Sequence, residues 1–393
     1  KPENFDIEAG KTVTKTITRV TENDATATIE GTEKTVLQQY KLVLSGLGSN
    51  IKQLKIRIAE GSVIDLNGNG NVQKNISIYN TLKTTATESK ADSAFLGNSS
   101  IQRQNIENIT FERSIPKTVY NEATGKFIDT TAWDVSASED NSIIAWYETS
   151  NNKGALKVHI GSNDEIFANQ NSTNLFAYIG RGDKSTSQET ITNINRLNVN
   201  YVTNMQAMFF ATGYKAMTSL DLGNAFKTDN VTNMDSMFMF TGYEAMTSLK
   251  LESNFNTSKV TNMSGMFWGT GSSSITEIKL GDKFDTSNVT NMGVMFVHTG
   301  EKSMTTLNLG SKFDTSNVTS MYATFQETGY TAMTSLYLGD KFDTSKVTNM
   351  KDMFYKTGAL SMTNLDFGPA FTKIADNHED MFIDTGKNGE VVI

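Results

Sequence analysis

A repeat of 29 residues runs through the second half of this chain and constrains its fold more than any other feature. The tetrad Val-Thr-Asn-Met, once changed to Val-Thr-Ser-Met, starts without any insertion at Val202, Val231, Val260, Val289, Val318 and Val347. Two phenylalanines keep the same register, one at Phe209, Phe238, Phe267, Phe296, Phe325 and Phe354, the other at Phe226, Phe255, Phe284, Phe313, Phe342 and Phe371. A unit this short cannot bury its apolar residues alone, so successive units must stack on one another.

Each unit divides into two hydrophobic patterns. Apolar residues two positions apart, such as Ile278 and Leu280, alternate as in a short strand. Residues 285–287 (Asp-Thr-Ser) can cap a helix, and Gly300 can end one. Between them the apolar residues follow helical spacing, at Val289, Met292, Met295 and Phe296. The pattern predicts a leucine-rich-repeat-like solenoid with a parallel sheet and short helices.

The rest of the chain predicts a multidomain protein of mixed α+β class. Residues 1–80 alternate polar and β-branched residues between turn-rich breaks, which favours an immunoglobulin-like (Ig-like) β-sandwich. Residues 81–93 are rich in Thr, Ser, Lys and Ala without periodicity, as in a linker. Residues 94–190 form a β-rich lead-in that caps the solenoid. Residues 191–393 are the solenoid itself, with a C-terminal cap around His378.

Composition excludes several functional classes. The 393 residues include no cysteine, so disulfides, thiolate metal sites and thiol nucleophiles are ruled out. The net charge is −8 and no basic stripe occurs, which argues against nucleic acid as a partner. The apolar runs are too short to cross a bilayer, so we expect no membrane insertion. The chain begins at Lys1, and we interpret it as a mature or excised piece.

The repeat resembles a known family. Residues 309–318 read LGSKFDTSNV and residues 231–238 read VTNMDSMF, which is similar to the BspA-like leucine-rich-repeat surface proteins of bacteria, whose units approximate LxLxxFDTSNVTNMxxMF. The resemblance covers about residues 94–393, while the first 80 residues resemble a generic bacterial Ig-like module. An added Thr-Gly-x-x-x-Met segment enlarges each unit beyond the family pattern. The resemblance implies exposure at the bacterial cell surface or secretion, with adhesion or host interaction, and implies no chemistry.

Strand alternation indicates which side chains could bind a ligand. Residues beside the paired leucines should point away from the core, onto the one surface to which every unit contributes. We predict a ligand-binding strand face at Asp221, Lys250, Glu277, Lys279, Asn308, Tyr337 and Asp366. The alternative is a merely soluble, exposed face. A second varied stripe, made of anchors or of cover for the edge of the units, includes Phe210, Phe240, Trp268, His298, Gln326 and Tyr355.

Other patterns favour structural interpretations. The three histidines lack metal-site spacing, so we expect no metal, no cofactor and no catalytic residues. The methionine ladder from Met205 to Met350 fits a core. The asparagine ladder from Asn204 to Asn349 should bond the backbone of adjacent units. Residues 181–183 spell Arg-Gly-Asp, the tripeptide read by integrins, but fit an ordinary loop. Residues 65–70 mimic half a calcium loop and fit a hairpin turn better.

These observations together predict a non-enzymatic, monomeric adhesin-like protein that binds an extracellular or host protein or glycan. One alternative is a passive structural stalk or cell-envelope spacer. A less favoured one is a polysaccharide-acting enzyme, which would need acidic and basic side chains converging on adjacent units. Asp221, Lys250 and Lys279 come nearest to that arrangement.

Overall fold

The computed structural model describes residues 80–150 and 153–387 in full, and of residues 1–79 the backbone of five strands. The chain divides into two compact units, Lys1–Asn80 and Thr81–Ile393. Among the described residues, no helix has the length and apolarity needed to cross a membrane. The half calcium loop at residues 65–70 lies outside the described residues.

The first unit contains two antiparallel sheets. Strand β4 (Gln53–Ile58) lies between β1 (Phe5–Glu8) and β5 (Lys74–Tyr79), and the long strands β2 (Thr14–Ile29) and β3 (Thr32–Ser45) form a hairpin. An Ig-like sandwich has about seven strands in two packed sheets. The described strands form sheets of three and two instead, so the predicted Ig-like sandwich is not what the structure contains.

The second unit begins with a mixed sheet in the order β11-β12-β13-β8-β15. Strand β8 is parallel to both of its neighbours, and the other pairs are antiparallel. The bounds are β8 (Ile106–Glu112), β11 (Trp133–Asp134), β12 (Ile144–Thr149), β13 (Leu156–Gly161) and β15 (Ile191–Thr192). Three short pairs flank this sheet: β6 (Ala94–Phe95) with β7 (Asn98–Gln102), β9 (Tyr120–Asn121) with β10 (Lys126–Phe127), and β14 (Ile166–Phe167) with β16 (Leu197–Asn198).

A buried arginine ties the start of this unit to the stacked repeats. Arg103, in the 3-10 helix η2 (Arg103–Asn105), is fully buried and donates hydrogen bonds to the carbonyl oxygens of Asn174, Leu175 and Ala177. It also pairs with the Glu88 carboxylate. Burial lowers the pKa of Arg103 to about 10, with the carboxylate opposing that change. Residues 81–93, interpreted above as a linker, therefore belong to the packed second unit, which also holds the buried Leu82.

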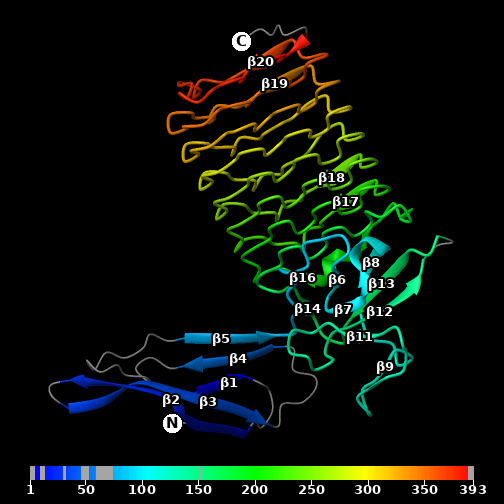
Figure 1. Cartoon of the computed structure of the whole chain (residues 1–393), viewed down its shortest axis with the longest axis vertical. Helices are drawn as coiled ribbons and strands as arrows, with labels where there is room; N and C mark the ends of the chain where they lie inside the picture. The colour runs from blue at the N-terminus through cyan, green and yellow to red at the C-terminus, as the bar shows by residue number, and fades with distance from the viewer. Residues whose placement is uncertain are drawn as a thin grey trace. The chain divides into compact units, whose positions relative to one another are not determined.

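The 29-residue units form coils that stack one above another (Figure 1). The short strands β17 (Ser219–Asp221) and β18 (Ser248–Lys250) pair in parallel, as do β19 (Ser335–Tyr337) and β20 (Asn364–Asp366). The intervening coils join this row through isolated bridges at Lys279 and Asn308. The predicted parallel sheet is thus broken into two small pairs.

The predicted short helices are also wrong. Apart from η2, the helix with defined bounds in the described chain is another three-residue 3-10 helix, η3 (Ile194–Arg196). Between Val289 and Gly300 the chain forms turns in which alternate amides bond the next coil, as Val294 N–H does to the Tyr322 carbonyl at 2.7 Å. Val294 has a φ of 54°, in the left-handed region that an α-helix cannot include. The second unit is therefore built almost entirely of short strands and turns, and the mixed α+β assignment is corrected.

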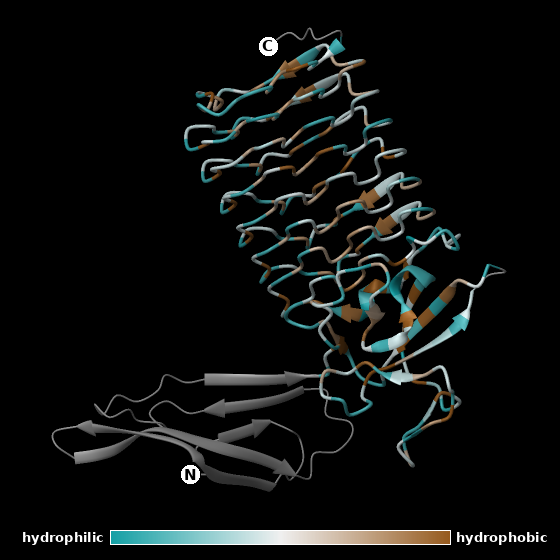
Figure 2. Ribbon diagram, viewed as in Figure 1, coloured by the Kyte–Doolittle hydropathy of each residue, from teal (hydrophilic) through white to brown (hydrophobic). Residues whose placement is uncertain are grey.

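The core predicted from the repeat is confirmed, except that Phe371 near the C-terminal end is only partly buried. Phe267, Phe296 and Phe325 are fully buried and stack with ring centroids 5.4 and 5.5 Å apart and planes within 8°. The methionine ladder is buried as well. Apolar segments recur along strands β17 to β20 in Figure 2. Burial of these ladders is the main favourable term in the stability of the stack, since each buried side chain contributes roughly 1.5 to 3 kcal/mol.

Buried threonines bond one coil to another. The Thr299 hydroxyl donates to the Phe267 carbonyl at 2.7 Å, and the same bond, spanning 32 residues, recurs from Thr241, Thr270, Thr328 and Thr357. The asparagine ladder behaves differently from the prediction. The Asn262 side-chain oxygen accepts from Ser264 N–H within its own coil at 3.1 Å, because an asparagine can close a local turn on the backbone two residues ahead.

Candidate binding face

The predicted strand-face residues form one row across six coils. Asp221 pairs with Lys250 in the β17–β18 ladder, and Tyr337 pairs with Asp366 in the β19–β20 ladder. Bridges then connect Lys250 to Lys279, Lys279 to Asn308 and Asn308 to Tyr337. The strand residues between, such as Leu249, are buried while their neighbours in the row are exposed. We call this set the strand-face row: Asp221, Lys250, Lys279, Asn308, Tyr337 and Asp366.

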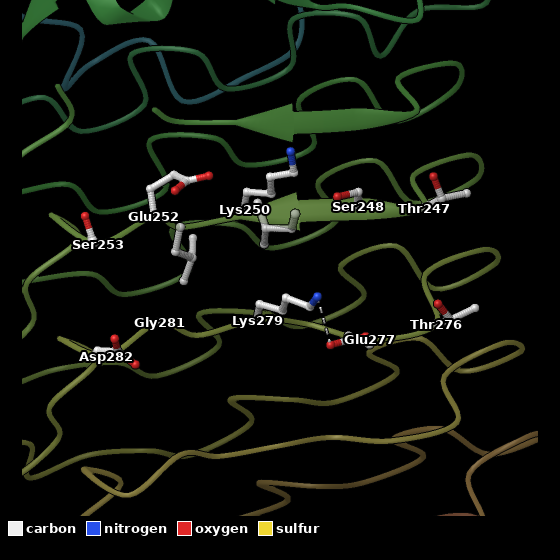
Figure 3. A pocket seen from close by; sticks show the side chains of 12 residues that line it. Thr247, Ser248, Lys250, Glu252, Ser253, Thr276, Glu277, Lys279, Gly281 and Asp282 are labelled. Carbon is white, nitrogen blue, oxygen red and sulfur yellow. Dashed lines mark ion pairs between the residues drawn. The ribbon is translucent and has the colours of Figure 1, made fainter. Parts of the chain in front are cut away.

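Glu277, the seventh predicted residue, lies beside the strand-face row. By the repeat register it corresponds to Ser219, Ser248, Ser335 and Asn364, of which Ser219 pairs with Ser248 and Ser335 with Asn364. Its carboxylate lies 3.6 Å from the Lys279 ammonium, as Figure 3 shows. The structure therefore brings together all seven residues that the alternation pattern selected.

The charges of the row are only partly paired. Lys250 lies 3.3 Å from the Asp221 carboxylate on the preceding coil, and both side chains are about half exposed. The Lys279 side chain is 75 % exposed. Exposed pairs of this kind contribute little to stability, typically below about 1 kcal/mol. These groups are thus available to a ligand without loss of the fold.

A shallow cavity of about 400 Å³ opens between two coils of the row. Its polar lining includes Ser248, Lys250, Glu252, Glu277 and Lys279 (Figure 3). Asp282 also lines the cavity, so two ammonium groups and three carboxylates surround one hollow. They can recognise hydroxyl, amide or charged groups by hydrogen bonds.

Tyr337 is the aromatic member of the row and is 50 % exposed. Its hydroxyl donates to the Asp340 carboxylate in the same coil, and this hydrogen bond raises the pKa of Tyr337. The bond fixes the ring at the surface. An exposed, oriented tyrosine is a common anchor in recognition surfaces.

The Arg-Gly-Asp tripeptide at residues 181–183 lies beside aromatic side chains. The guanidinium of Arg181, in the Arg-Gly-Asp tripeptide, lies over the rings of Tyr178 and Tyr214 at 5.7 and 5.6 Å. Asp183 is almost fully exposed, 3.9 Å from Lys215. Arg181 is exposed as well, and its guanidinium packs at the same time against aromatic rings of its own protein.

The second varied stripe forms an aromatic row along another edge of the coils. Phe240 lies 5.9 Å from Phe210 and 5.8 Å from Trp268 by ring centroids. Tyr214 and Tyr243 stack at 4.8 Å nearby. Phe210, Phe240 and the two tyrosines line, with Arg181 and Tyr178, a cavity of about 540 Å³, which the sequence analysis missed. The 29-residue separation of the two stacked tyrosines was the available signal.

The histidines divide between structural roles and one close cluster. His378 Nδ1 lies 2.7 Å from the Ala375 carbonyl in the terminal coil. His159 stacks on Trp146 with ring centroids 5.2 Å apart. In the part of the chain that the structure describes, one group of histidine and carboxylate side chains converges closely enough to hold a metal ion: His298, Glu301 and Glu327.

Comparison with known families identifies the repeat region. The model of the family described as "Mycoplasma protein of unknown function, DUF285" matches residues 183–300, 239–361 and 271–390, which overlap to cover more than half of the chain. It is a repeat family tied to the BspA-like surface proteins. No curated protein and no solved structure shows a significant match to the chain.

Proposed function

The chain belongs to the DUF285 family, and on that premise we propose that it is a non-enzymatic binding protein of the bacterial cell surface, or a secreted one. Its stacked coils would present the strand-face row and Glu277 to an extracellular or host protein or glycan. The observation that carries this proposal is the alignment of six exposed, chemically varied side chains on consecutive coils.

Rigidity of the face supports a binding role. Each coil is held to the next by backbone bonds, buried threonine hydroxyls and stacked phenylalanines. A face already fixed in its bound geometry loses little conformational entropy on association, which improves affinity. The strand-face row therefore suits recognition of an extended ligand that contacts several coils at once.

The chemistry of the row favours a polar ligand. Lys250 and Lys279 supply donors, Asp221 and Asp366 supply acceptors, and Tyr337 supplies an apolar surface with a polar tip. Side chains of all three kinds meet the hydroxyls and ring faces of a glycan, or the polar surface of a protein. Binding without turnover is the activity that we propose.

The test is a binding screen with matched variants. Immobilised glycans, mucins and extracellular-matrix proteins are probed with the wild-type chain and with the triple variant Lys250→Ala, Lys279→Ala, Tyr337→Ala. The control variant removes the same side-chain types outside the row, at Lys259, Tyr322 and Lys346, of which Tyr322 is 39 % exposed. Circular dichroism verifies that both variants keep the fold.

We expect saturable binding of at least one ligand class. The row variant should bind it at least tenfold more weakly, because anchor residues at the centre of an interface carry most of its free energy. The control should bind as the wild type does. Equal binding by both variants would refute the assignment of the face, and the absence of saturable binding would favour the structural stalk or cell-envelope spacer.

A further inference from the structure

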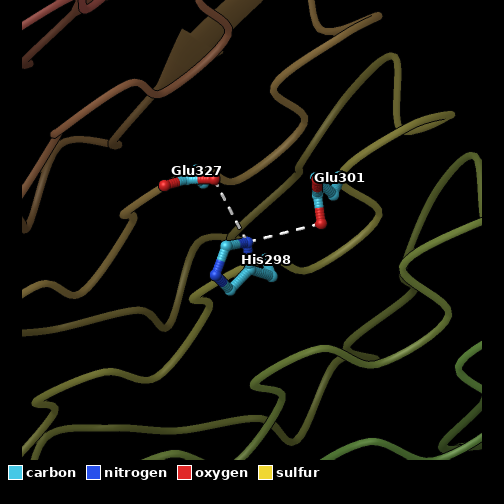
Figure 4. A group of neighbouring side chains, drawn as sticks. All are labelled: His298, Glu301 and Glu327. Carbon is cyan, nitrogen blue, oxygen red and sulfur yellow. Dashed lines mark ion pairs between the residues drawn. The ribbon is translucent and has the colours of Figure 1, made fainter.

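One histidine and two glutamates from neighbouring coils converge on a single point. His298 Nδ1 lies 3.3 Å from a Glu301 carboxylate oxygen and 3.4 Å from a Glu327 carboxylate oxygen (Figure 4). One nitrogen and one oxygen from each carboxylate all lie within 4.8 Å of one another. The three side chains are between 21 and 32 % exposed, so the group lies at the surface but is partly shielded from water.

The ring nitrogen at the centre of this group has no hydrogen-bond partner. His298 Nδ1 is inaccessible to solvent, yet its contacts with the two carboxylates fall outside hydrogen-bond geometry. A buried polar atom of this kind costs free energy unless another group satisfies it. The two carboxylates also repel each other when both are ionised. A divalent cation between the three groups would remove both penalties.

The fold creates this cluster only once among the described coils. His298 and Glu327 occupy the same position in consecutive coils, with φ values of 51° and 53°. The equivalent residues on either side are Gly269 and Lys356, which cannot complete a second cluster. The Ser272 hydroxyl donates to the Glu301 carboxylate at 3.2 Å and thereby orients it. Such supporting bonds are typical of groups that hold metal ions.

Two of the three ligand separations match a tetrahedral metal site. Zinc binds histidine nitrogen and carboxylate oxygen at about 2.0 to 2.2 Å, and tetrahedral angles then place neighbouring ligand atoms about 3.3 to 3.5 Å apart. The two nitrogen–oxygen separations, 3.3 and 3.4 Å, fall within that range, and the two carboxylate oxygens lie within 4.8 Å of each other. Imidazole nitrogen suits zinc and similar transition metals, whereas calcium and magnesium prefer oxygen ligands.

We propose that His298, Glu301 and Glu327 form a site for Zn²⁺ or a related divalent transition metal. His298 binds through Nδ1, each glutamate contributes one oxygen, and the remaining coordination position faces water. The ion joins two consecutive coils, because His298 and Glu301 come from one and Glu327 from the next. Binding therefore stabilises the middle of the stack and leaves one open position for an outside ligand.

His159 provides a matched comparison within the same chain. It also contacts two glutamates, but through different nitrogens: Nδ1 lies 2.9 Å from Glu112, and Nε2 lies 3.6 Å from Glu148. Two nitrogens on opposite sides of the ring cannot direct both carboxylates to one ion. A histidine with two acidic neighbours is therefore not sufficient, and convergence on one nitrogen distinguishes His298.

The experiment titrates the whole 393-residue chain with ZnCl₂ alone. Isothermal titration calorimetry gives stoichiometry and affinity, and ¹⁵N-correlated NMR of the three histidine rings identifies which ring responds. The variants are His298→Gln, Glu301→Gln and Glu327→Gln, which keep side-chain size, with His159→Gln as the control. Titrations with CaCl₂ and MgCl₂ test the selectivity, and circular dichroism verifies folding.

We expect one zinc ion per chain, a shift of the His298 resonances alone, and thermal stabilisation by zinc but not by calcium or magnesium. The His298→Gln variant should bind zinc at least 100-fold more weakly, and Glu301→Gln and Glu327→Gln each at least tenfold more weakly. The control His159→Gln should bind zinc as the wild type does. Absence of zinc binding, or binding that persists unchanged in His298→Gln, would overturn the proposal.

Discussion

Replacing Phe296 with alanine tests whether the phenylalanine ladder carries the stability of the stack. The Phe296 ring is fully buried and stacks on Phe267 and Phe325 at 5.4 and 5.5 Å. Phe382 occupies the equivalent position in the last coil, where it is partly exposed, stacks in parallel on Phe354 alone, at 5.6 Å, and has the tilted Phe367 ring at 6.0 Å. The two positions therefore differ in burial and in the number of stacked neighbours, and share their place in the coil.

The magnitudes follow from these surroundings. Truncating a buried phenylalanine costs about 3 to 5 kcal/mol in the free energy of unfolding. Each aromatic pair contributes about 0.5 to 1.5 kcal/mol beyond burial, so the loss of two pairs places Phe296→Ala at the upper end of that range. Phe382→Ala should cost about 1 to 2 kcal/mol, because the partly exposed ring loses less buried area. Phe296→Leu keeps the apolar volume and should lie between these values.

The assay is equilibrium unfolding in urea, followed by far-ultraviolet circular dichroism on the full chain. A loss of stability appears as a lower transition midpoint at unchanged slope. Hydrogen exchange of amides in the coils that flank Phe296 then locates the effect. Equal destabilisation by Phe296→Ala and Phe382→Ala would refute the reasoning, since the stacked, buried ring would then contribute no more than the terminal one.

Three further changes test other contacts. Thr299→Val removes one of the two hydrogen bonds to the buried Phe267 carbonyl, which keeps the Thr270 N–H, and should cost about 0.5 to 1.5 kcal/mol in urea unfolding. Thr290→Val at an exposed hydroxyl should cost less than about 0.5 kcal/mol, and equal costs would contradict the role of the buried bond. Arg103→Ala leaves the buried Glu88 carboxylate unpaired and should lower the free energy of unfolding by about 3 to 5 kcal/mol. The control Arg113→Ala, at an exposed position, should change it by almost nothing. A small effect at Arg103 would show that the buried pair is dispensable. Burial raises the pKa of Asp285, but hydrogen bonds from the Ser287 hydroxyl and N–H outweigh burial, so the pKa is lower than the usual 3.8. The stabilising effect of the ionised Asp285 is therefore present above about pH 3.8 and is lost as the pH falls through the folded-state pKa. The difference in melting temperature between wild type and Asp285→Asn should therefore shrink from pH 6 to pH 2, and a constant difference would contradict this assignment.

The repeat register made the core of the stack predictable. A fixed 29-residue step places equivalent side chains above one another, so the buried phenylalanines and methionines followed directly from the sequence. Period-two alternation also selected the strand-face row, because it distinguishes Leu249 from the exposed residues beside it. Whether that row binds a ligand remains a prediction for the screen described above.

The helices were mispredicted because spacing alone does not reveal where backbone amides bond. Apolar residues three and four positions apart also fit a series of turns whose alternate amides reach the next coil, as at Met292 and Val294. Left-handed residues without glycine, such as Val294, gave no sequence signal against a helix. Neighbouring coils therefore decided the local structure, and tertiary contacts outweighed intrinsic preference.

The histidine cluster escaped sequence analysis for a related reason. Metal motifs are usually sought within one helix or loop, whereas His298 and Glu327 are 29 residues apart and meet only because coils stack. A search for metal ligands separated by one 29-residue repeat would have paired His298 with Glu327. Glu301, three residues after the histidine, completes the group through a turn within the coil.

The bonds between coils join equivalent atoms at every step. The Thr261 hydroxyl donates to the Thr232 carbonyl at 3.2 Å, and the Thr290 hydroxyl donates to the Thr261 carbonyl at 3.1 Å. With respect to these bonds, one coil can replace the next. If one whole 29-residue period were deleted, the Thr290 hydroxyl would meet the Thr232 carbonyl, to which Thr261 donates in the present chain. Lineages could lengthen or shorten such a protein by unequal recombination within its gene, changing its reach in increments of about 4.8 Å while the repeated threonine bonds between the remaining coils stay intact.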